Sequence, residues 1–199
     1  MTDASPSPRT KPPEVRREEL MDAAEALFVE KGVAAASIDG IVTAAGVSKG
    51  GFYHHFASKD AILIALQDRL VANFCADIEA AQSRLAPDDW HGRLEALVRA
   101  SAGSFFARQA VHDVVFHDFK PPERREMNQN AVVDLLGQFL AAGEKAGAWS
   151  LADPQLTAVM LFHALHGACD EAVLEPQRVS REGVVRYLLL FFRRVLGIS

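Results

Sequence analysis

The chain has 199 residues, of which 49% are hydrophobic and 24% charged, and its formal net charge at pH 7 is −5. This composition excludes a wholly disordered chain, and no stretch has the roughly 20 apolar residues that a membrane-spanning helix needs. The two cysteines, Cys75 and Cys169, have no CxxC spacing, which excludes a zinc finger and is typical of the reducing cytoplasm. We therefore expect a cytoplasmic protein that does not associate with membranes. The acidic net charge argues against general affinity for nucleic acids, although a local basic face can still bind DNA.

The N-terminal residues predict an arm followed by one helix. Four prolines fall within residues 1–13, so we expect this arm to be disordered. A first helix is predicted over 14–31, because Leu20, Ala24 and Leu27 recur at the spacing of one apolar helix face. Gly32 follows at the position where a left-handed residue often caps a helix.

Two short helices are predicted next, and each follows a serine that can cap it. Ser37 precedes the first and Ser48 the second, while Gly46 between them supplies the positive φ that a tight turn requires. Two short helices joined by such a turn form a helix-turn-helix, whose second helix enters the major groove of DNA. Between residues 40 and 59 the chain carries lysines and histidines but no carboxylate. We assign residues 14–57 to a DNA-binding domain.

The remaining residues, 58–199, predict six further helices and no strand. Their ends are marked by capping serines or aspartates and by proline or glycine stops. The helices are expected from Ser58 toward Leu85, from Asp88 or Asp89 through Phe105, from Val111 to Phe119, from Glu123 to Ala146, from Pro154 to Leu174, and from Ser180 to near Gly197. The sequence therefore predicts an all-α fold of about nine helices, with an N-terminal three-helix domain and a C-terminal helical domain.

The segment from Ile41 to Asp60 reads IVTAAGVSKGGFYHHFASKD. An alanine pair before Gly-Val-Ser, an aromatic pair, a further aromatic residue and a Ser-Lys-Asp at the fourth helix together resemble the signature of the TetR family of transcriptional regulators. The resemblance covers about the first third of the chain. It implies a repressor that a small-molecule effector releases from a near-palindromic operator in double-stranded DNA.

The resemblance also assigns roles in DNA binding. Ser37 and Thr43 would contact phosphates or groove edges, Ser48, Lys49, Gly50 and Gly51 would open the recognition helix, Tyr53 and His54 would face the groove, and Lys59 would clamp a phosphate. Phe52 and Phe56 are assigned to the core. Because the two glycines leave few side chains to contact bases, we expect DNA shape to share in the specificity.

The resemblance further implies that the C-terminal domain binds an effector and forms a dimer. Candidate ligand-binding residues are Phe74, Phe105, Phe116, His117, Phe162, His163 and His166, with Phe106, Phe119 and Met127 as further aromatic or Met candidates. The eighth and ninth helices are apolar around much of their circumference, which favours a homodimer that pairs them across a two-fold axis. A monomer with a deeply buried hairpin is the alternative.

Histidines and aspartates gather near the sixth and eighth helices, among them His112, His117, His163, His166 and Asp170. Such residues bind zinc or nickel when the fold brings them together, or they anchor the polar group of an organic effector. We favour the organic effector and predict neither a metal nor a cofactor.

Two other functional classes have less support, and we predict that the chain is not an enzyme. The same histidines are the only support for an enzyme, because the chain has no GxSxG, no HExxH and no phosphate-binding glycine loop. A helical scaffold that has lost DNA binding is the other alternative. The presence of Ser48, Lys49, Tyr53 and Lys59 argues against it.

Overall fold

The computed structural model describes the backbone of residues 12–118 and 125–198, with the side chains outside residues 117–130. Within these ranges the protein is helical and has no strand, so the predicted all-α class is confirmed. The helices are α1 (Pro13–Lys31), α2 (Ile38–Ala45), α3 (Lys49–His55), α4 (Lys59–Gln82), α5 (Trp90–Ala107), α6 (Gln109–His112), the π-helical stretch η1 (Asp113–Asp118), α7 (Arg125–Lys145), α8 (Pro154–Leu174) and α9 (Arg181–Val195). None of the described helices is long and apolar enough to cross a membrane.

Most of the helix starts are fixed by local caps. The capping residues are Ser37, Ser48, Ser58, Asp89, Asp153 and Ser180, and in each the side chain accepts a hydrogen bond from the backbone N–H three residues further on. Such a bond satisfies one of the N–H groups that a helix start leaves without an intrahelical acceptor. This is why starts predicted from single residues agree with the structure.

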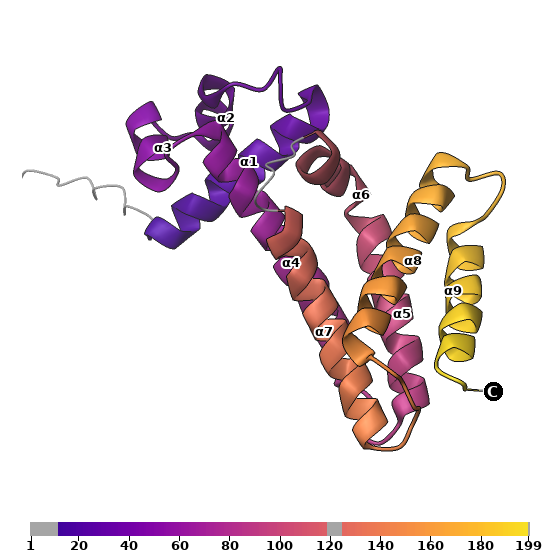
Figure 1. The fold of residues 1–199 in the computed structure, drawn as a ribbon. Helices are drawn as coiled ribbons and strands as arrows, with labels where there is room; N and C mark the ends of the chain where they lie inside the picture. The colour runs from indigo at the N-terminus through magenta and orange to yellow at the C-terminus, as the bar shows by residue number, and fades with distance from the viewer. Residues whose placement is uncertain (1–11, 119–124, 199) are drawn as a thin grey trace, which may run out of the picture.

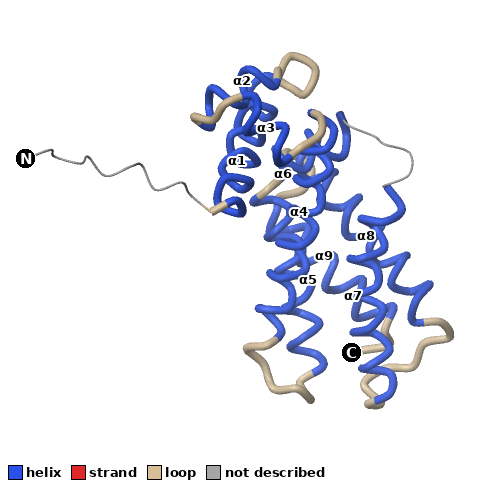
Figure 2. Tube along the Cα trace, turned by 90° about the vertical axis from the view of Figure 1, so that its left-hand side faces the viewer, coloured by secondary structure: helices blue, strands red, loops and turns tan. Residues whose placement is uncertain are grey.

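The helices form a head and a body (Figure 1). We call α1, α2, α3 and the first turns of α4 the head, and the remainder of α4 with α5, α7, α8 and α9 the body. Helix α4 runs from the head into the body, where α8 packs against α7, α5 and α9. In the view turned by 90°, α1, α2 and α3 again lie at one end, with the C-terminus at the other (Figure 2).

Each part has its own hydrophobic core. In the head, Leu20, Phe28, Ile41 and Phe52 have no exposed surface and Phe56 is 4% exposed, which confirms the core roles predicted for the two phenylalanines of the signature. The same cluster includes Ile62, Leu63 and Leu66 of α4 and Val114 and Val115 of η1. The packing of the head therefore extends beyond residue 57, where the sequence placed the end of the DNA-binding domain.

The region around α6 differs from its prediction. A single segment was expected from Val111 to Phe119, whereas α6 begins at Gln109 and changes to π-helical geometry at Asp113. A π-helical stretch is rare and is frequently found at functional sites. Residues 1–11, Phe119 and Glu123 lie outside the described residues. Helix α4 ends at Gln82 rather than near Leu85, because the chain turns before Pro87.

Candidate functional site

The turn between α2 and α3 has the conformation that a helix-turn-helix requires. Gly46 adopts φ 65° and ψ 32°, the left-handed region that glycine enters without a steric penalty. Its backbone N–H donates to the carbonyl oxygens of Thr43 and Val42, and the N–H of Val47 donates to the same Val42 oxygen at 3.0 Å. The turn thus fixes α3 relative to α2 through backbone contacts.

Helix α3 has one buried and one exposed face. Phe52 anchors the buried face, and the ring of Tyr53 packs edge-on against it with centroids 5.5 Å apart while remaining 51% exposed. Lys49, Gly50 and His54 are exposed beside it. The residues predicted to meet DNA at the recognition helix therefore lie together on a surface that a groove can reach.

The two glycines of α3 are not required by the packing of the chain itself. A Cβ atom built on Gly50 would have only the Ser48 hydroxyl within reach, at 3.9 Å. At Gly51 the nearest atom would be the same hydroxyl at 3.4 Å, an ordinary contact. Their role in letting DNA approach the backbone stays a prediction.

Three hydroxyl groups of the predicted site already form hydrogen bonds. The Ser37 and Ser48 oxygens accept from Gly40 and Gly51, each at 3.1 Å, and keep a hydroxyl hydrogen that can be donated. The Thr43 hydroxyl donates to the carbonyl of Asp39 at 2.7 Å. In this conformation Thr43 offers lone pairs but no hydrogen to a phosphate, so its phosphate contact stays a prediction that needs a rotation of the side chain.

Lys49 is held by an acidic residue that sequence reasoning did not assign to the site. Its Nζ lies 2.8 Å from Oδ1 of Asp39, and both side chains are exposed. The hydrogen bond from the ammonium to this carboxylate raises the pKa of Lys49 above its usual value. Asp39 stands one residue before the segment without carboxylates, which was the signal available in the sequence. The pair places a negative charge beside the proposed DNA contact.

Lys59 has a second role besides the predicted phosphate clamp. Its Nζ donates to the carbonyl oxygens of Val33 and Ala36, at 2.7 and 3.0 Å. These bonds tie the start of α4 to the loop between α1 and α2. Lys59 thus stabilises the fold of the head, and its contact with phosphate stays a prediction.

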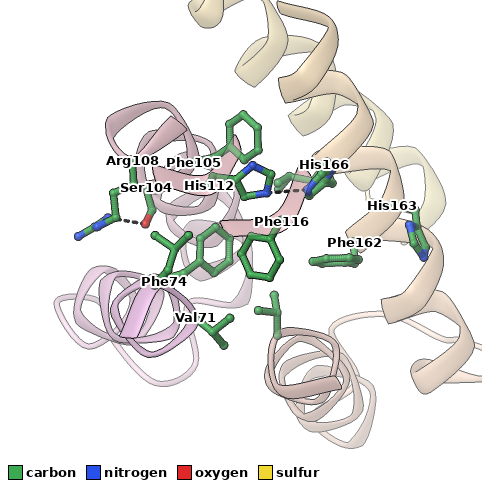
Figure 3. A pocket seen from close by; sticks show the side chains of 13 residues that line it. Val71, Phe74, Ser104, Phe105, Arg108, His112, Phe116, Phe162, His163 and His166 are labelled. Carbon is green, nitrogen blue, oxygen red and sulfur yellow. Dashed lines mark hydrogen bonds between the residues drawn. The ribbon is translucent and has the colours of Figure 1, made fainter. Parts of the chain in front are cut away.

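A cavity of about 210 Å³ lies where α4, α5, α6, η1, α7 and α8 meet (Figure 3). It is lined by Leu70, Val71, Phe74, Ser104, Phe105, Arg108, His112, Phe116, Val132, Phe162, His163, Leu165 and His166. Six of the seven predicted ligand-binding residues are among them. The side chain of the seventh, His117, and that of Met127 lie outside the described residues, as does Phe119. Phe106 instead packs against the body core, under the guanidinium of Arg181.

Two histidines from distant parts of the chain meet in this cavity. Nε2 of His112 lies 3.0 Å from Nε2 of His166, and the contact joins α6 to α8 (Figure 3). On the outer sides of the rings, Nδ1 of His166 lies 3.1 Å from Asp170, and Nδ1 of His112 lies 3.5 Å from Asp113. The sequence had singled out both histidines, but their 54-residue separation concealed the contact.

Arg108 and Ser104 were missed by the sequence analysis, because neither stands out from its neighbours. The Arg108 guanidinium donates to Asp77 and to the Ser104 hydroxyl, each at 2.7 Å. Together the Ser104 hydroxyl and this guanidinium hold the pKa of Asp77 below its usual value.

No three His, Cys, Asp or Glu side chains of the described chain come together as a metal site would require.

Matches to known proteins identify the family. A family model described as bacterial regulatory proteins, tetR family, matches residues 20–66. The HTH-type transcriptional repressor KstR2 of Mycobacterium tuberculosis is 33% identical over 141 residues, which cover 64% of this chain and 68% of the relative. The chain belongs to the TetR family. The matched residues include both helices of the helix-turn-helix and the cap of α4.

A second sequence relative matches a shorter part of the chain, whereas a solved structure matches nearly all of the fold. KstR2 of Rhodococcus jostii is 35% identical over 102 residues, so this chain covers 47% of that relative's length. A solved complex of SmeT with triclosan has 22% sequence identity, a TM-score of 0.74 and 91% coverage of both chains. That likeness shows that head and body together have the fold of known TetR-family structures.

Proposed function

We propose that this TetR-family chain is a repressor that binds a near-palindromic operator as a homodimer and leaves it when a small organic effector fills the cavity. The observation that carries the proposal is the exposed face of α3, where Lys49, Tyr53 and His54 surround a backbone that two glycines leave accessible. Helix N-termini with exposed N–H groups attract phosphates, and a lysine adds charge for the same contact. KstR2, the relative from Mycobacterium tuberculosis, is itself described as a repressor.

Selection of bound sequences from a random duplex pool, followed by a salt titration on the winner, tests DNA binding. We expect an enriched near-palindrome, and a logarithm of affinity that falls steeply with the logarithm of the salt concentration. Lys49→Ala should reduce that slope by about 0.9, the value for one lost phosphate contact. Lys145→Ala, an exposed lysine at the end of α7, is the matched control and should leave the slope unchanged. Failure to enrich any sequence would instead favour a scaffold.

The homodimer is supported by apolar side chains that one chain leaves exposed on α8 and α9. Leu156 and Met160 on α8 are 55% and 61% exposed, and Tyr187 and Phe191 on α9 are 61% and 46% exposed. Gly167 of α8 has open space around it, which permits a second helix to approach closely. Helices of this kind need a partner on their second face. A dimer built there would present two recognition helices to operator half-sites about 34 Å or a multiple apart.

Sedimentation of two charge variants tests this interface. Met160→Glu should yield a monomer that keeps its helical content but loses operator affinity, because one recognition helix forms half of the contacts. Val29→Glu, at an exposed apolar position of α1, should remain dimeric. A Met160→Glu protein that sediments as a dimer would place the interface elsewhere.

Contacts of η1 with both the cavity and the head support a coupling between effector binding and DNA binding. His112 and Phe116 line the cavity, while Val114 and Val115, on the intervening turn, belong to the core of the head. The side-chain amide of Gln67 on α4 donates to the backbone oxygen of Val115. An effector that favours a different position of η1 would therefore shift α4 and the helix-turn-helix with it. The effector releases DNA only if it binds the conformation that does not bind DNA more tightly than the conformation that does.

A relative shows that this fold can hold a small organic compound. The solved SmeT structure is a complex with triclosan. For this chain, we expect the operator complex to dissociate when a compound that binds in the cavity is added. If no compound that binds the free protein changes its operator affinity, effector control is not its mechanism.

A further inference from the structure

The acidic residue Asp39 lies among the predicted DNA contacts of the head. It occupies the first turn of α2, one helical turn before Thr43, whose hydroxyl donates to the Asp39 carbonyl oxygen at 2.7 Å. Residues four apart lie on the same face of a helix. Across the turn, the Asp39 carboxylate contacts Lys49 at the start of α3, and the two side chains are 72% and 56% exposed. A DNA duplex that contacts Thr43 and Lys49 therefore also meets a negative charge.

Lys49 carries much of the positive charge that the helix-turn-helix can offer to DNA. Between residues 40 and 59 the sequence has two lysines and no arginine. The second lysine, Lys59, donates from Nζ to two backbone carbonyl oxygens, at 2.7 and 3.0 Å. The Lys49 ammonium has the Asp39 carboxylate as its partner at 2.8 Å. The attraction of this surface for phosphates therefore depends on whether Lys49 leaves Asp39.

The ion pair between Lys49 and Asp39 is of a kind that DNA can break. Exposed ion pairs stabilise proteins little, because solvent screens the charges and both side chains lose freedom when they pair. With Nζ 2.8 Å from the carboxylate oxygen, a phosphate oxygen bonded to the same ammonium would lie less than about 6 Å from that oxygen. This separation is shorter than the Debye length of about 10 Å at 0.1 M salt, so the two anions repel each other. The lysine relieves the repulsion when its flexible stem turns the ammonium from Asp39 to the phosphate.

We propose that Asp39 limits the affinity of this protein for DNA by competing with phosphate for the Lys49 ammonium. The proposal rests on the DNA contact proposed above for α3. Asp39 is thus a positioning residue, which holds the ammonium beside α2 in the free protein and loses it when DNA binds. Because every duplex contains phosphates, the competition affects the operator and unrelated DNA alike.

Fluorescence anisotropy of the full chain on two labelled duplexes measures this competition. One duplex is the operator obtained by the sequence selection, and the other has the same length and base composition in scrambled order. We expect Asp39→Asn to bind both duplexes more tightly than wild type. The slope of log affinity against log salt concentration should steepen by about 0.9 for each Lys49 that contacts DNA. For one such contact, the gain in affinity should therefore fall by about three- to fourfold between 50 and 200 mM salt.

Two variants separate this effect from a general change of charge. Asp88→Asn changes the net charge by the same amount, but Asp88 is an exposed residue of the turn between α4 and α5, at the end of α4 away from the head (Figure 1). Its affinity and salt slope should equal those of wild type. Asp39→Glu keeps the carboxylate and should bind close to wild type, more weakly than Asp39→Asn. Circular dichroism confirms that each variant is folded.

A double-mutant cycle with Lys49→Ala tests whether Asp39 acts through the lysine. If DNA binding breaks the ion pair, Asp39→Asn gains more affinity in the wild-type background than in the Lys49→Ala background. The two gains should differ by about twofold to fivefold, which corresponds to the contribution of an exposed ion pair. Simple repulsion between the carboxylate and DNA would instead give equal gains in both backgrounds.

Three results would overturn the proposal. The first is an Asp39→Asn protein that binds both duplexes no more tightly than wild type. The second is a gain confined to the operator, which would make Asp39 a reader of bases, and the third is an equal gain in the Lys49→Ala background. In each case a wild-type protein that binds the operator keeps its repressor function. Failure of the wild-type protein to select any operator would refute the DNA-binding function and the competition together.

Discussion

Replacing Arg69 with methionine tests how strongly α4 is held to α1. The guanidinium contacts three carboxylates of α1, at 3.0 Å from Glu18, 2.7 Å from Asp22 and 2.7 Å from Glu25. Methionine keeps much of the apolar stem while removing the charge, so the three acids lose this cation, and within the described part of the chain only Glu18 keeps another one, Arg17 at 3.7 Å.

The expected loss follows from the exposure of the partners. Glu18 and Asp22 are 52% and 71% exposed, so each of these pairs is assigned the roughly 0.5 kcal/mol of a surface ion pair. Glu25 and Arg69 are 34% and 22% exposed, and about 1 kcal/mol is a fair value for a hydrogen bond in that setting. The sum is about 2 kcal/mol of unfolding free energy, which for a chain of this size lowers Tm by about 4–8 °C.

Thermal unfolding followed by circular dichroism at neutral pH and low salt measures this difference. Arg99→Met is the matched control, because Arg99 contacts a single carboxylate, Glu95, and is 58% exposed. Its loss should stay below about 0.5 kcal/mol. In about 1 M salt the surface pairs are screened, so the Arg69→Met difference should shrink. A loss no larger than that of the control, or one unchanged by salt, would refute the charge network as its cause.

Three further predictions concern stability, DNA affinity and titration. Gly46→Ala should cost about 1–2 kcal/mol in urea unfolding, because alanine resists the left-handed conformation, whereas Gly50→Ala should leave stability intact and weaken operator binding in a gel-shift assay. The pKa of Asp77 is lowered in the folded protein by Ser104 and Arg108, so its carboxylate stabilises the fold above the unfolded-state pKa. The Tm advantage of wild type over Asp77→Asn should therefore be full at neutral pH and vanish as the pH falls through that lowered pKa; a constant advantage would contradict the assignment. Burial raises the pKa of the Cys169 thiol to about 12, so native protein at pH 9 should resist alkylation at this residue, as mass spectrometry of labelled peptides can show.

Local chemistry explains which parts of the fold were predictable from sequence. A capping serine such as Ser48 acts on an N–H three residues away, and Gly46 acts on its own φ angle. Both effects are contained in a few consecutive residues. The buried positions of Phe52 and Phe56 follow from helical periodicity in the same way.

Contacts between distant residues were not predictable in this way. The pairing of Lys49 with Asp39 depends on the angle between two helices, and the bonds of Lys59 depend on the path of a loop that precedes it by more than twenty residues. The meeting of His112 with His166 requires α6 and α8 to be adjacent, which no single-segment pattern contains. No pattern in the sequence marked the π-helical geometry of η1.

The sharing of one core between the head and η1 limits how the protein can be cut and recombined. Val115 is fully buried and Val114 is 8% exposed among head residues, although both lie more than forty residues beyond α3. A hybrid regulator that joins residues 1–57 to the C-terminal domain of another protein would lack Ile62 and the two valines of this cluster. The apolar side chains of α1 to α3 that pack in the same cluster would then be exposed. Exchange of specificity between such regulators is therefore better made by replacing the surface residues of α3 than by transplanting the N-terminal segment as a cassette.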